Sequence, residues 1–79
     1  MAIKVLIIDD DERERIVLRY IIEQMDDVKI IGEASNGIEG VMLAKEKKPD
    51  LVLLDIFMPE LNGIETARRL RELPQPPLF

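Results

Sequence analysis

Residues 3–11 read IKVLIIDDD and residues 51–55 read LVLLD, and these two segments decide the fold. Each contains an unbroken run of four apolar residues, 5–8 and 51–54, which is followed directly by aspartate. Runs of this kind, rich in Val, Ile and Leu, are typical of strands that are buried on both faces of a parallel sheet. A third run, residues 28–34 (VKIIGEA), lies between them. We therefore predict three strands, at residues 3–8, 28–34 and 51–54.

An amphipathic stretch follows each predicted strand. Apolar residues recur at helical spacing within residues 16–25, 38–44 and 64–70. Each stretch follows a capping-box pattern, in which Glu comes three residues after the cap. The caps are Asp11, Asn36 and Asn62. The second helix is expected to end before Pro49 and the third before Pro74, because the residue preceding proline avoids the α region. Three strand-helix units, (βα)3, predict an α/β fold with a parallel sheet, since such crossovers are right-handed.

The composition excludes several classes of function. The 79 residues include 11 Lys+Arg and 16 Asp+Glu, for a net charge of −5, and neither Cys nor His. A chain this acidic is a poor match for nucleic acid or for an anionic membrane surface. Zinc sites of Cys and His, thiol chemistry and imidazole catalysis are excluded. The longest apolar runs are far shorter than the roughly 20 residues of a membrane span, and no secretory signal is recognisable, so we expect a cytoplasmic protein.

The acidic residues at the strand ends are the candidate functional residues. If the first and third strands are neighbours, Asp9, Asp10 and Asp55 converge at one edge of the sheet, where ligands bind in such folds. Two carboxylates about 4 Å apart repel by about 4 kcal/mol at an effective dielectric constant near 20, so the group needs a cation or a proton. Oxygen ligands alone favour Mg²⁺, which leaves positions for phosphate oxygens. Asp11 is expected to act only as a helix cap.

Four segments together resemble the receiver domain of bacterial two-component response regulators, the CheY-like family. They are VLIIDD at 5–10, EASNG at 33–37, LVLLDIFMP at 51–59 and Asn62-Gly63. The resemblance covers essentially all 79 residues. It implies a doubly wound, flavodoxin-like parallel sheet with strand order 2-1-3. Residues 1–79 would form a single truncated receiver domain that lacks the last two βα units.

The resemblance also implies roles for individual residues. Asp55 would be the phosphoryl acceptor and a contact of Mg²⁺, and Asp10 would be a direct Mg²⁺ ligand. Asp9 would be a direct or water-mediated ligand, and the backbone carbonyl of Phe57 a further ligand. A sensor histidine kinase would supply the phosphoryl group, and an output partner would receive the signal. Met58 and Pro59 are expected to shape the loop, and Gly63 either permits close approach to that loop or is merely tolerated there.

The chain departs from the family pattern at its C-terminal side. The missing units would supply a Ser/Thr and a Lys that meet the phosphoryl group, and no residue here takes either role. Strand 51–54 would also lie at a sheet edge although it is apolar throughout. Bare apolar edges invite pairing with another chain. We therefore predict a homodimer or a swapped assembly that covers this edge, using residues 77–79, which read like the opening of a fourth strand.

Two other functions compete with the phosphoryl acceptor. One is a receiver remnant that binds a partner without phosphorylation. The other is a haloacid-dehalogenase-like phosphatase with Asp9 as nucleophile and Asp11 as acid, but Arg13 stands where that resemblance expects a hydroxyl residue. A dinucleotide-binding fold is rejected, because three aspartates follow the first strand where glycines would be required.

Overall fold

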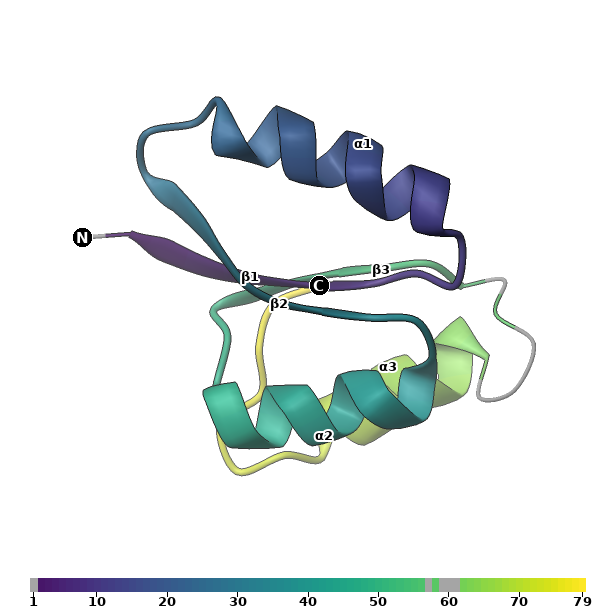
Figure 1. Cartoon of the computed structure of the whole chain (residues 1–79). Coiled ribbons are helices and arrows are strands. Elements are labelled where there is room, and N and C mark those ends of the chain that lie inside the picture. Colours follow the sequence, from purple (N-terminus) through teal and green to yellow (C-terminus); the bar gives the residue numbers. More distant parts are fainter. Residues whose placement is uncertain (1, 57, 59–61) are drawn as a thin grey trace.

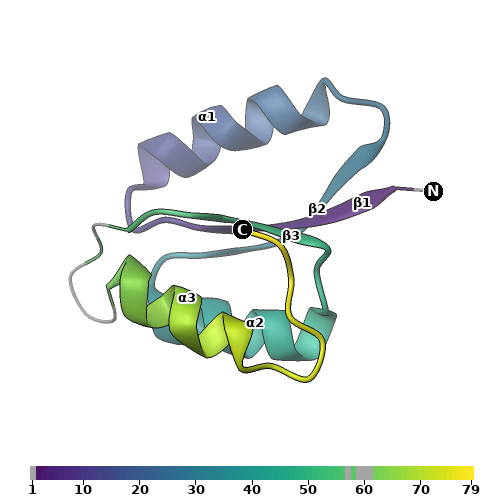
Figure 2. The ribbon, with the colours of Figure 1, turned by 180° about the vertical axis from the view of Figure 1, so that it is seen from behind.

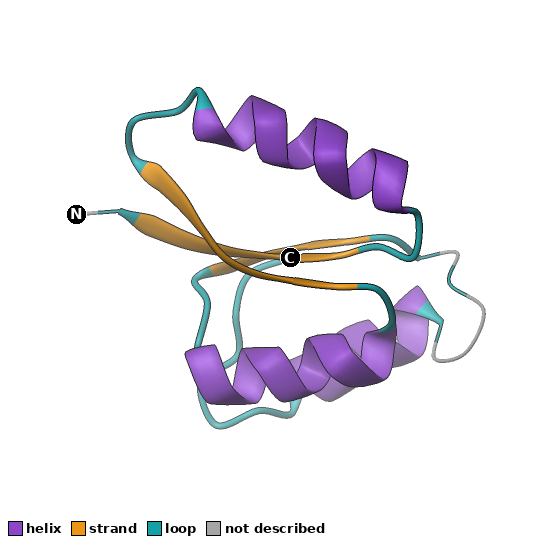
Figure 3. Cartoon of the chain, in the orientation of Figure 1, coloured by secondary structure: helices purple, strands orange, loops and turns teal. Residues whose placement is uncertain are grey.

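The described part of the chain contains three strands and three helices that alternate along the sequence. The computed structural model describes residues 2–56, 58 and 62–79. The strands are β1 (Ile3–Ile8), β2 (Val28–Ala34) and β3 (Leu51–Leu54). The helices are α1 (Glu12–Glu23), α2 (Gly37–Lys47) and α3 (Gly63–Arg71) (Figure 3). The predicted strand ranges and the strand-helix order are confirmed.

The strands form one parallel sheet in the order β2-β1-β3. Helix α1 covers one face of the sheet, and α2 and α3 cover the other (Figure 1). The predicted strand order 2-1-3 and the placement of helices on both faces are thereby confirmed. Within the described residues, no helix is both long enough and apolar enough to cross a membrane.

The central strand β1 supplies both halves of the core. Val5 and Ile7 pack with Ile22 of α1 on one face of the sheet. Leu6 and Ile8 belong to the cluster on the opposite face, which contains Val52, Ala44 of α2 and Leu70 of α3. The side chains of successive strand residues point to opposite faces, so an unbroken apolar run is required for a strand covered on both sides.

The three predicted cap residues each accept a backbone hydrogen bond from the first turn of their helix. The side chain of Asp11 accepts a hydrogen bond from the backbone N–H of Arg13 at 2.9 Å. Asn36 and Asn62 accept from the backbone N–H groups of Glu39 and Glu65, at 2.8 and 2.9 Å. Helix α2 ends at Lys48, which adopts the left-handed conformation (φ 50°) immediately before Pro49. These contacts satisfy backbone groups that the first and last helical turns leave unpaired.

The C-terminal residues lie along the outer edge of β3 (Figure 2). Leu78 forms an isolated parallel bridge with Leu51. Its carbonyl accepts from Val52 N at 2.7 Å, and its own N–H donates to Asp50 O at 3.0 Å. Leu78 therefore pairs with the first part of β3 at the edge of the sheet of its own chain. Assembly with a second chain stays a prediction.

Gly63 allows α3 to approach the chain just after β3. A Cβ atom at this position would lie 2.0 Å from Ile56 Cα and 2.7 Å from Asp55 O. Both of these are backbone atoms, which cannot move aside as a flexible side chain can. Gly63 N also donates to Ile56 O at 3.1 Å. Of the two interpretations of Gly63, the close approach is confirmed.

We predict that Gly63→Ala destabilises the fold by about 1–3 kcal/mol, as overpacking of a tight contact does. In a chain of this size each kcal/mol lowers the melting temperature by roughly 4–8 °C, which circular dichroism measures. The matched control is Gly32→Ala, where the nearest atom to a new Cβ is a side-chain carbon of Leu6 at 3.3 Å. An equal loss in the two variants would contradict the backbone clash at Gly63.

Candidate functional site

Asp9 and Asp55 lie side by side at the carboxyl ends of β1 and β3. The register of these strands pairs Ile8 with Leu54, so the next residue of each strand is an aspartate. The hydrogen-bond ladders continue into both residues. Asp9 N donates to Ala34 O at 3.0 Å, and Asp55 N donates to Ile8 O at 2.9 Å. The two aspartates are therefore close together as a direct consequence of the strand register.

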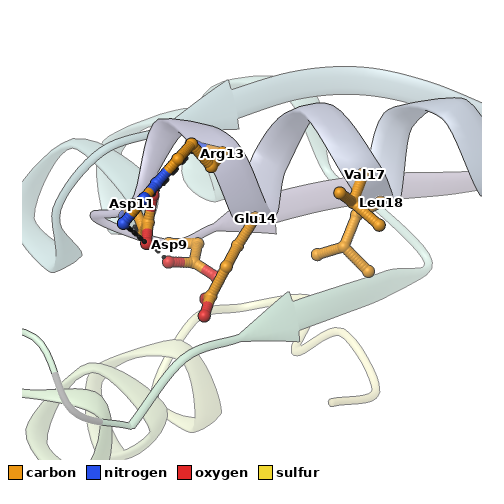
Figure 4. A pocket seen from close by; sticks show the side chains of 6 residues that line it. All are labelled: Asp9, Asp11, Arg13, Glu14, Val17 and Leu18. Atoms are coloured by element: carbon orange, nitrogen blue, oxygen red, sulfur yellow. Dashed lines mark hydrogen bonds and ion pairs between the residues drawn. The ribbon is translucent and has the colours of Figure 1, made fainter.

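Glu14 of α1 joins the two aspartates. Ile8 and Leu54 pack on the face covered by α2 and α3, so strand alternation places Asp9 and Asp55 on the face covered by α1. One carboxylate oxygen each from Asp9, Glu14 and Asp55 lie within 4.8 Å of one another. Figure 4 shows the Glu14 side chain reaching from the first turn of α1 toward Asp9. We call these three residues the carboxylate cluster.

The structure brings together only some of the site residues that the resemblance implies. Asp9 and Asp55 are brought together, whereas Asp10 is exposed and is not among the carboxylates grouped in the described part of the chain. Phe57 and Pro59 lie outside the described residues. Met58 is buried in the core cluster beneath α2 and α3. The capping-box pattern assigns Glu14 only to the start of α1. Its position five residues after Asp9 indicates that it lies near the end of the strand, but not that it faces Asp9 and Asp55.

The three carboxylates differ in their surroundings. Asp9 is 5% exposed, and its Oδ1 accepts from the backbone N–H of Asp11 at 2.9 Å. Asp55 is half-buried and Glu14 is exposed. An open cavity of about 540 Å³ adjoins the cluster. It is lined by Asp9, Asp11, Arg13, Glu14, Val17 and Leu18 (Figure 4).

The cluster favours a bound positive charge. A hydrogen bond between the Glu14 and Asp9 side chains, together with the negative charge of Asp9, raises the pKa of Glu14 to about 7. Asp11 and Asp55 add smaller charge effects in the same direction. A proton on Glu14 is one way to relieve the repulsion, and a cation is the other. The donor set consists of carboxylate oxygens alone, which suits a hard divalent ion such as Mg²⁺.

The sequence matches a protein family along most of its length. The family model described as "Response regulator receiver domain" matches residues 5–79. The chain is 46% identical over 78 residues to the transcriptional regulatory protein LiaR of Bacillus subtilis, covering 98% of this chain and 37% of LiaR. It is 46% identical over 68 residues to the nitrate/nitrite response regulator protein NarL of Escherichia coli K12, covering 86% and 32%. The chain therefore spans about a third of the length of these relatives.

Solved structures match the fold as well. The response regulator domain of Thermotoga maritima CheB superposes with a TM-score of 0.90 at 41% identity, covering 99% of this chain and 57% of that one. The receiver domain of the putative response regulator NarL from Mycobacterium tuberculosis gives a TM-score of 0.86 at 32% identity, covering 92% and 60%. The match to each solved domain thus leaves a substantial part of that domain without a counterpart here.

We predict that Glu14→Gln makes the metal-free chain less sensitive to rising pH. With its pKa raised from 4.5 to about 7, Glu14 holds its proton more tightly in the folded chain than in the unfolded chain. Its contribution to stability is complete below pH 4.5 and is lost as the pH rises through about 7. In EDTA, the variant should therefore be more stable than the parent at pH 8, and this advantage should shrink at pH 5. Urea denaturation at the two pH values measures the difference.

The control for this comparison is Glu12→Gln, which removes an exposed carboxylate from the same helical turn. It should keep the pH dependence of the parent. If the parent and Glu14→Gln lost the same stability between pH 5 and pH 8, the proposed repulsion within the carboxylate cluster would be wrong.

Proposed function

The chain belongs to the response regulator receiver family, and from this premise we propose that it accepts a phosphoryl group on Asp55 with the help of Mg²⁺ and passes the signal to an output partner. One observation carries the proposal. Asp55 stands beside Asp9 and Glu14 at the carboxyl edge of the sheet, with one oxygen of each within 4.8 Å of the others. Nucleophile and metal-binding groups are thereby available in one place.

A carboxylate nucleophile such as Asp55 needs no general base for this reaction, because it has no proton to lose when it attacks. A carboxylate oxygen of Asp55 attacks phosphorus in line and forms an acyl phosphate, while the bond from phosphorus to the donor breaks. With a phosphohistidine donor, the bond that breaks is the P–N bond, and its electron pair stays on the imidazole. The backbone hydrogen bond from Asp55 N to Ile8 O, at 2.9 Å, anchors the nucleophile at the end of β3.

We propose that Asp9, Asp10, Asp55 and the backbone carbonyl of Phe57 hold the Mg²⁺, with Glu14 as an additional oxygen donor from α1. When bound, the ion offsets negative charge on the carboxylates and on the incoming phosphoryl oxygens. Asp9 and Glu14 contribute by presenting oxygens on the same face of the sheet as Asp55. Asp9 and Asp55 belong to the ends of neighbouring strands, and Glu14 belongs to the first turn of α1.

The proposed partners follow from the same premise. A sensor histidine kinase in the cytoplasm would supply the phosphoryl group. The name of LiaR, a transcriptional regulatory protein, makes a transcriptional output one class to consider. A further match is the protein-glutamate methylesterase/protein-glutamine glutaminase of Thermotoga maritima, so an enzymatic output is another class.

A second candidate is a binding module that works without phosphorylation. The large apolar side chains exposed on α1 favour it, among them Val17 at 57% and Tyr20 at 68%. The phosphatase alternative is weaker, because hydrogen bonds from Arg13 hold the pKa of Asp11 below its usual value. A carboxyl with a lowered pKa is a poor proton donor at neutral pH, and Asp11 already caps α1.

We predict that the chain incubated with Mg²⁺ and acetyl phosphate gains one phosphoryl group, seen as a single adduct by intact mass spectrometry. Asp55→Asn should abolish the adduct because it removes the nucleophile. Asp26→Asn, a change at an exposed aspartate in the turn after α1, should leave it intact. An adduct that persisted in Asp55→Asn, or that formed equally in EDTA, would refute the proposal. A parent chain that gained no phosphoryl group would also refute it and would favour the binding module.

We also propose that the homodimer expected at the β3 edge is a swapped pair. Leu78 of a second copy would make the same hydrogen bonds to Val52 and Asp50 that Leu78 makes within one chain, so the exchange needs no new contacts. Light scattering over a concentration series should show a dimer that grows with concentration. Leu78→Pro removes the N–H that donates to Asp50 O and should abolish the dimer. A parent chain that remained monomeric at every concentration would refute the swap.

A further inference from the structure

Arg15 joins α1 to the end of β1. Its side chain is 17% exposed, which is unusually buried for an arginine. Its Nη1 donates to the main-chain carbonyl of Asp9 at 2.6 Å, and its Nε lies 3.8 Å from Glu33 Oε1. The guanidinium thus lies between a backbone group at the carboxylate cluster and an acidic residue of β2.

Glu33 is itself held in place by a second arginine of α1. Arg19 donates to both of its carboxylate oxygens, from Nε at 2.7 Å and from Nη2 at 2.9 Å. This two-point pairing gives a defined geometry as well as attraction. The hydrogen bond from Arg19, with the charges of Arg19 and Arg15, lowers the pKa of Glu33, so Glu33 is ionised at neutral pH. Arg15 therefore faces a fixed negative charge.

The hydrogen bond from Arg15 completes a set of three contacts that restrain Asp9. Asp9 N donates to Ala34 O at 3.0 Å, and Asp9 Oδ1 accepts from Asp11 N at 2.9 Å. The carbonyl of Asp9 is the other main-chain polar group of the residue, and Arg15 binds it. That carbonyl belongs to the peptide that links Asp9 to Asp10. Its orientation therefore affects where both carboxylates stand relative to Asp55.

We propose that Arg15 is a positioning residue of the divalent cation site, which holds the Asp9–Asp10 peptide in the orientation that directs the Asp9 carboxylate toward a cation beside Asp55. The proposal rests on the proposed function, because it assumes that the site binds Mg²⁺. Groups that orient metal ligands typically change metal affinity by 10–100-fold when they are removed. Arg15 acts through Asp9 and does not itself bind the cation.

The competing interpretation is that Arg15 only ties α1 to β2. Arg19 serves to distinguish the two interpretations. It binds Glu33 from the same helix but, among the described residues, donates no hydrogen bond to Asp9. Loss of a purely structural tie would lower stability in either arginine variant. Loss of a positioning contact would weaken cation binding only in the Arg15 variant.

The test compares Arg15→Met and Arg19→Met in the whole chain, titrated with MgCl2 by isothermal calorimetry well below both melting temperatures. Methionine keeps an unbranched side chain of similar reach but donates no hydrogen bond. We expect Arg15→Met to raise the Mg²⁺ Kd about 10-fold, the lower end of the range for such residues, and Arg19→Met to leave it unchanged. In the metal-free chain, Arg15→Met should shift the ¹³C resonance of the Asp9 carbonyl and the amide resonance of Asp10, and Arg19→Met should not.

The two proposals can fail separately. A parent chain that bound no Mg²⁺ would refute the metal site of the proposed function. Equal Mg²⁺ affinity in the parent and Arg15→Met, or equal weakening in the two arginine variants, would refute the positioning role alone. If Arg15→Met does not fold, Arg15→Lys replaces it. Lysine keeps the charge without the planar donor set, and a shifted Asp9 carbonyl resonance with an unchanged Kd in that variant would likewise overturn the proposal.

Discussion

The burial of β1 on both of its faces is the constraint on which the other features depend. Val5, Leu6, Ile7 and Ile8 are all at most 1% exposed, and alternate members of this run pack against α1 and against α2 with α3. Burial of each such side chain stabilises the fold by roughly 1.5–3 kcal/mol. A shift of one residue would exchange the two faces. The position of Asp9 at the end of the strand is therefore set by the packing of the core.

The same packing concentrates negative charge at one place. Asp9 and Asp55 follow core residues of neighbouring strands, and Glu14 is added by the helix that covers their face. The three carboxylates repel one another, and either a proton on Glu14 or a bound cation relieves this repulsion. On the β2 side of α1, Arg15 and Arg19 balance Glu33. Arg15 of α1 thus connects an acidic site to an ion-pair network through the backbone of Asp9.

The outer edge of β3 is only partly covered. Leu78 pairs with the beginning of the strand, while Ile56 and Ile64, beside its carboxyl end, are 50% and 75% exposed. The match to the solved CheB domain covers 57% of that domain. An apolar edge with this exposure is a surface on which further polypeptide can pack.

The sequence by itself determined the strands, the helices, their caps and the family, because each depends on local periodicity or on residues that are close in the chain. It also indicated that Asp9 and Asp55 meet, since parallel strands end at one edge. Tertiary structure alone decided that Glu14 joins them, that Arg15 binds the carbonyl of Asp9, and that Gly63 touches the backbone of Ile56. These contacts depend on the rotation of a helix about its axis and on its distance from the sheet. Both are results of side-chain packing between segments far apart in the chain, and no local pattern encodes them.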